Sequence, residues 1–198
     1  GVSGGTWTVQ PSFFAAPTPN YAVDTTPMGV ALTDIDQDGY MDIVTANNTG
    51  NTISTILGNG NGTFQLPVNT SVSNNPGGVT MADLNGDGYL DMIVLNNNGN
   101  TSSKVTVLAG QAGGTYAAPI DFAVSVRGLV SVAVGIVKNK ATNLPDIVFV
   151  GQNDNAVGIL LNGGTVGGAI TSMTFTGAAS TDATPQTMAT GVRATLFD

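Results

Sequence analysis

Short runs of apolar residues and threonine alternate along this chain with clusters of Gly, Asn and Asp. Runs of this length, rich in Val, Ile, Leu and Thr and bounded by turn-forming residues, are typical of β-strands. The pattern predicts three groups of four strands each. They lie at 29–33, 41–46, 52–57 and 63–68, then at 79–82, 90–95, 104–109 and 115–122, and finally at 129–137, 146–151, 156–161 and 172–177.

The groups recur with a period of about 50 residues, marked by an aromatic residue with Pro three positions later. A Gly-rich turn precedes this aromatic residue. Four antiparallel strands per unit at this period predict an all-β fold, a β-propeller of four-stranded antiparallel blades. The aromatic and proline pairs are Phe14/Pro17, Phe64/Pro67 and Tyr116/Pro119.

The period divides the chain into one propeller domain, 1–198, with three full blades and a partial blade at each end. The first strand of each unit is expected to be innermost. A closed propeller needs roughly four to eight blades. Two interpretations stay open: the chain is part of a larger or self-associated propeller, or it ends at a genuine terminus with a chance Asp at 198. The predicted bounds are 1–23 (partial), 24–73, 74–125, 126–180 and 181–198 (partial).

Two acidic loops stand between the predicted first and second strands of the first two blades, 34–42 and 83–91, starting 49 residues apart. Each carries oxygen-bearing side chains at positions 1, 3, 5 and 9 and Gly at position 6. This spacing suits a hard cation with oxygen ligands, most of all calcium. The alternative is a turn whose Asp side chains only cap backbone amides. An EF-hand is excluded because position 12 is Thr45 or Val94 instead of Glu, and the flanks are strand-like.

Composition narrows the chemistry further. The 13 acidic residues are all Asp, the chain has no Cys and no His, and its net charge is −8. Disulfides, thiolate sites and His-dependent nucleophiles are therefore excluded within this chain. The acidity argues against nucleic acid and anionic membranes as partners. No apolar run approaches the roughly 18 residues of a membrane span.

The D-x-[DN]-x-D-G-x-x-D-[IM]-[IV] segments resemble the FG-GAP/VCBS repeat family, the propellers of integrin α-subunit heads and many secreted bacterial proteins. The resemblance implies two calcium ions, one per loop, and a secreted or cell-surface protein. The first implied ligand set is Asp34, Asp36, Asp38, the Tyr40 carbonyl and Asp42. The second is Asp83, Asn85, Asp87, the Tyr89 carbonyl and Asp91.

The third unit departs from this pattern. Asp146 keeps position 9, but the earlier acidic positions are lost and Lys138 and Lys140 appear. We expect no cation there, and expect the lysines to neutralise Asp146.

These observations predict a non-catalytic extracellular binding module for a glycan or a protein, not an enzyme. The alternatives are an accessory domain of a secreted carbohydrate-active enzyme and a purely structural surface component. The Asn run is expected to form a turn, and Tyr40 and Tyr89 are expected to pack as framework residues. Candidate surface residues are Trp7, Tyr21, Tyr40, Tyr89 and the run 96–100.

Overall fold

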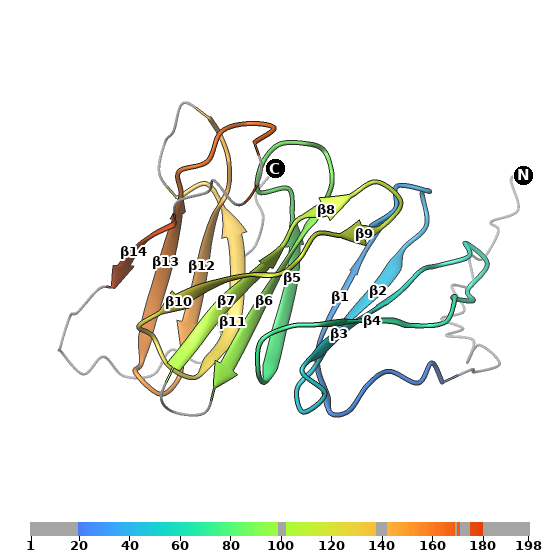
Figure 1. Cartoon of the computed structure of the whole chain (residues 1–198), viewed down its shortest axis with the longest axis horizontal. Helices are drawn as coiled ribbons and strands as arrows, with labels where there is room; N and C mark the ends of the chain where they lie inside the picture. The colour runs from blue at the N-terminus through green and yellow to red at the C-terminus, as the bar shows by residue number, and fades with distance from the viewer. Residues whose placement is uncertain (1–19, 99–101, 138–141, 169, 171–174, 180–198) are drawn as a thin grey trace, which may run out of the picture.

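The computed structural model describes residues 20–98, 102–137, 142–168, 170 and 175–179 (Figure 1). The described residues form β-strands and turns, without an α-helix, in three four-stranded antiparallel sheets and one two-stranded ribbon. The all-β prediction with four-stranded antiparallel blades is confirmed. Nothing in the described part of the chain combines the helical length and apolar character that crossing a membrane would require.

Each sheet is built from consecutive strands that pair with their neighbours in the chain, apart from the small ribbon inserted in the second. The first contains β1 (Pro27–Thr33), β2 (Asp42–Asn47), β3 (Thr52–Ile56) and β4 (Val68–Ser71). The second contains β5 (Pro76–Ala82), β6 (Asp91–Asn98), β7 (Ser102–Leu108) and β10 (Ile120–Val124), with β8 (Gly110–Gln111) and β9 (Thr115–Tyr116) forming the ribbon. The third contains β11 (Leu129–Gly135), β12 (Asp146–Gly151), β13 (Ala156–Asn162) and β14 (Phe175–Ala179).

The strand register repeats in all three sheets. The last residue of the first strand pairs with the position-9 Asp that opens the second strand, as Thr33↔Asp42, Ala82↔Asp91 and Gly135↔Asp146. An irregularity falls near the start of the first strand in each sheet, between Pro27/Gly29, Pro76/Gly78 and Leu129/Ser131. The third unit therefore keeps the blade geometry although its loop has lost most of the acidic residues.

The outermost strands of the first two sheets lie later in the chain than the predicted ranges 63–68 and 115–122. Phe64 pairs instead with Gly58, and β9 pairs with β8, so each aromatic residue closes a small hairpin. The fourth strand then begins at the residue after Pro67 or Pro119, as β4 or β10. A proline lacks the amide hydrogen that a ladder position needs, so it marks the entry to the strand and not its interior.

The hydrophobic core lies between neighbouring sheets. Val44, Ala46 and Ile53 of the first sheet share one cluster with Met92, Val94 and Leu108 of the second. Alternate residues of the same second-sheet strands, such as Ile93 and Val105, face the third sheet and meet Ile147, Phe149 and Leu160. The second sheet is therefore covered on both faces, as expected for a blade between two blades (Figure 1).

Candidate metal centre

The two acidic loops occupy equivalent places in the fold. Each connects the first strand of its sheet to the second, β1 to β2 and β5 to β6. The position-6 glycines, Gly39 and Gly88, have φ values of 89° and 90°. This left-handed conformation is strained for other residues, which explains the glycine shared by both loops.

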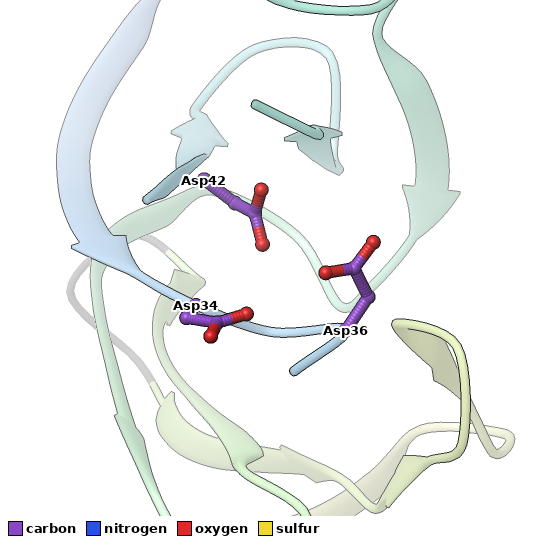
Figure 2. Close-up of side chains that lie close together, drawn as sticks. All are labelled: Asp34, Asp36 and Asp42. Atoms are coloured by element: carbon purple, nitrogen blue, oxygen red, sulfur yellow. The ribbon is translucent and has the colours of Figure 1, made fainter. Parts of the chain in front are cut away.

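Three carboxylates converge in the first loop. One oxygen each from Asp34, Asp36 and Asp42 lies within 4.8 Å of the other two, and their carboxylates face a common space (Figure 2). Burial raises the pKa of Asp36 above its usual value, and the negative charges of Asp38, Asp42 and Asp34 add to the increase. A hydrogen bond from Asp38 N acts in the opposite direction and lowers this pKa, but it does not cancel the increase. The loop therefore holds negative charge that a cation would neutralise.

The same side chains also hold the backbone of the first loop. The Asp34 carboxylate accepts hydrogen bonds from Asp38 N at 3.2 Å and Gly39 N at 2.9 Å. Asp38 accepts one from Tyr40 N at 2.8 Å. Amide capping, the alternative interpretation of the sequence, is thus present, and it pre-orders the loop with three carboxylates still close together.

The second loop repeats these contacts. Asp83 accepts hydrogen bonds from Asp87 N at 3.2 Å and Gly88 N at 2.9 Å, and Asp87 accepts one from Tyr89 N at 2.9 Å. Asn85 stands where the first loop has Asp36. Its Nδ2 donates to Asp87 Oδ2 at 2.8 Å, and its Oδ1 accepts from Asp87 N at 3.1 Å.

The position-9 Asp has a role that sequence reasoning missed. In all three sheets this residue is fully buried and accepts two backbone amide hydrogen bonds, one from its own loop and one from a residue at or just after the end of the third strand. The donors are Ile35 and Gly58 for Asp42, Leu84 and Gly110 for Asp91, and Val137 and Asn162 for Asp146, at distances of 2.7–3.0 Å. The Asp-[IM]-[IV] sequence shared by the three units is the signal that could have revealed this role.

Buried Asp91 is costly to ionise. Burial raises the pKa of Asp91 to about 6, and the charges of Asp87 and Asp83 add to the increase. The hydrogen bonds from the Gly110 and Leu84 amides favour the charged form and lower the pKa, but they do not cancel the effect of burial. A cation bound beside Asp91 would oppose this shift. The lysines expected to neutralise Asp146, Lys138 and Lys140, lie outside the described residues. Asp146 accepts hydrogen bonds from the backbone amides of Val137 and Asn162.

The donor set of both loops fits calcium. Side-chain oxygens from positions 1, 3, 5 and 9, together with a backbone carbonyl, are the hard ligands that calcium takes. Each position-9 carboxylate has about four lone-pair sites, so two amide hydrogen bonds leave capacity for a cation. The remaining calcium donors predicted from the sequence, the carbonyls of Tyr40 and Tyr89, follow the position-6 glycines in each loop.

The other candidate residues take structural places. Tyr21 accepts a hydrogen bond from Phe64 N at 2.8 Å and meets its ring edge-on. Asn96 and Asn97 belong to β6, so the predicted turn is wrong there: Asn96 is buried, and Asn97 exchanges two 2.6 Å hydrogen bonds with the Leu129 backbone. The ring of Tyr40, 47% exposed, lies against Gly60. Trp7 and residues 99–100 lie outside the described residues.

A pocket of about 640 Å³ lies beside the second loop. Its walls come from the loop, from the β8–β9 ribbon with the segments on either side of it, and from the connection between β13 and β14. The lining is mainly apolar, with a phenol, side-chain amides and one carboxylate among it. It includes Asn85, Asp87, Tyr89, Gln111, Pro119 and Ile120.

Comparison with known families agrees with this geometry. Residues 34–94 match the model of the FG-GAP-like repeat. No curated protein matches the chain. The matched segment begins at Asp34, contains both acidic loops and ends within β6. Residues 34–94, which carry the two loops and the strands that hold them, are therefore similar to the FG-GAP-like repeat.

Proposed function

We propose that this chain is a calcium-stabilised, non-catalytic binding module that acts outside the cell and recognises a glycan or an extracellular protein. The observation that supports it most is the convergence of Asp34, Asp36 and Asp42 within an FG-GAP-like repeat. Calcium in each loop would neutralise the carboxylates and fix the turn into the second strand of the blade.

A binding role is favoured over catalysis by the surroundings of the remaining carboxylates. Asp24 accepts hydrogen bonds from Thr25 and Thr52. Asp121 pairs with Lys104 at 2.7 Å, and Asp154 with Arg127. Each of these described carboxylates is engaged in holding local structure.

Calcium at ten times its dissociation constant should stabilise the folded chain by about 1.4 kcal/mol per site, because it binds the folded loops and not the unfolded chain. The measurement is thermal unfolding in calcium and in excess chelator, with calorimetry to count bound ions. We expect two ions and a higher melting temperature in calcium. Identical melting temperatures with no calorimetric binding would refute the calcium part of the proposal.

We propose the pocket beside the second loop as the recognition site for a neutral saccharide. The Tyr89 ring, Pro119 and Ile120 offer apolar surface to a sugar ring, and the exposed amide of Gln111 offers hydrogen bonds to hydroxyls. A net charge of −8 disfavours anionic sugars. The same pocket would serve if the chain is an accessory domain of a secreted carbohydrate-active enzyme.

Replacing Gln111 with alanine should weaken saccharide binding about fivefold, the loss of one hydrogen bond. Gln111 is exposed and is not an expected calcium ligand, so the calcium affinity should stay unchanged. The measurement is a glycan array on the calcium-loaded protein, followed by titration of the strongest hit. The control is Gln65→Ala, an exposed glutamine that does not line the pocket. An array without hits would favour the structural alternative.

A further inference from the structure

One side chain of the first acidic loop reaches the second loop. Gln37, at position 4 of the first loop, donates from Nε2 to the carbonyl oxygen of Gly88 at 2.6 Å. Gly88 is position 6 of the second loop, 51 residues away. The two candidate calcium loops are therefore linked directly across the boundary between two blades.

Gln37 occupies a backbone position that favours glycine. Its φ is 64°, while the equivalent residue of the second loop, Gly86, has a φ of 72°. Placing a non-glycine residue in this conformation costs free energy, so we expect a contact of the Gln37 side chain to offset that cost. At Gly86 there is little room for a side chain, because an added Cβ would lie 3.1 Å from Val166 and 3.3 Å from Leu144 of the third blade.

The contact falls on the peptide that precedes an expected ligand. The Gly88 carbonyl and the Tyr89 amide belong to one peptide plane. Gln37 Nε2 donates to the oxygen of this peptide, and the N–H of the same peptide donates to Asp87 Oδ1 at 2.9 Å. Gly88 N in turn donates to Asp83 Oδ2 at 2.9 Å. Since the Tyr89 carbonyl follows directly, a peptide pinned at both ends orients the carbonyl that calcium would use.

We propose that Gln37 is a positioning residue for the calcium site of the neighbouring blade: it belongs to the first loop but supports cation binding in the second. This inference rests on the proposed function, because it assumes that both loops take calcium. It makes the second site dependent on the first blade, whereas the spacing of the repeat alone predicts two self-contained sites.

The test is a calcium titration of the full chain followed by NMR, with the amide signals of Gly39 and Gly88 reporting the first and second loops separately. Gln37→Gly removes the side chain and suits a φ of 64°. We expect the dissociation constant reported by Gly88 to rise about tenfold, as for loss of an outer hydrogen bond to a metal site. The constant reported by Gly39 should change less than about twofold by the same reasoning.

Two further variants separate positioning from backbone effects. Gln37→Met keeps the length of the side chain but cannot donate, so it should weaken the Gly88 response as Gln37→Gly does. Gln65→Ala, remote in sequence and exposed, should change neither signal. A Gly88 response of normal strength in both Gln37 variants, or an equal loss at both loops, would overturn the inference. A wild-type chain without any calcium response would refute the proposed function itself.

Discussion

Asp146→Ala should lower the free energy of unfolding by about 4 kcal/mol, and by the same amount in calcium and in chelator. The carboxylate is fully buried and accepts Val137 N at 3.0 Å and Asn162 N at 2.7 Å. Each hydrogen bond to a charged acceptor contributes about 1.5–3 kcal/mol, and alanine would leave the two amides without this partner. Chemical denaturation monitored by circular dichroism measures the loss.

The third blade makes this test independent of metal. Its loop lacks the acidic residues at positions 1, 3 and 5, so loss of Asp146 should report its contacts within the protein and not the loss of a bound cation. The matched control is Asp154→Ala, which breaks an exposed pair with Arg127 and should have a small effect. A loss at Asp146 no larger than at Asp154 would contradict a structural role for the position-9 carboxylate.

Gly110→Ala should destabilise the protein by about 3 kcal/mol. An added Cβ would overlap the carbonyl oxygen of Leu90, which the backbone holds in place. Relieving this overlap costs about 1–3 kcal/mol, and displacing the chain weakens the 2.9 Å hydrogen bond from Gly110 N to Asp91. The measurement is again denaturant unfolding, in calcium and in chelator.

Gly135→Ala is the matched control, since an added Cβ at Gly135 has open space around it within 4 Å and no left-handed φ. This substitution should be close to neutral or slightly favourable in a strand. If Gly110→Ala were as stable as Gly135→Ala, the hairpin after the third strand would be free to move away from the acidic loop, contrary to the structure.

The strand interiors and the acidic loops were predictable because their signals are local. Apolar runs between turn residues located β12 at its observed bounds and the starts of β2 and β6 to within one residue. The outer strands were placed wrongly, because the aromatic residues at 64 and 116 look like strand residues but close small hairpins. Which of two equally β-prone stretches joins the sheet is settled by pairing partners, not by propensity.

The sequence by itself determined the repeat, the four-stranded unit and the two loops with calcium-like spacing, because each is a pattern of residue types along a short stretch of chain. Only the tertiary structure decided what those residues do for one another. Each of Asp42, Asp91 and Asp146 is buried with a hydrogen bond from an amide that lies 16 to 19 residues away in the chain. The contact of Gln37 with Gly88 spans two blades. Hydrogen bonds between distant segments follow from how sheets stack, and no local pattern specifies that stacking.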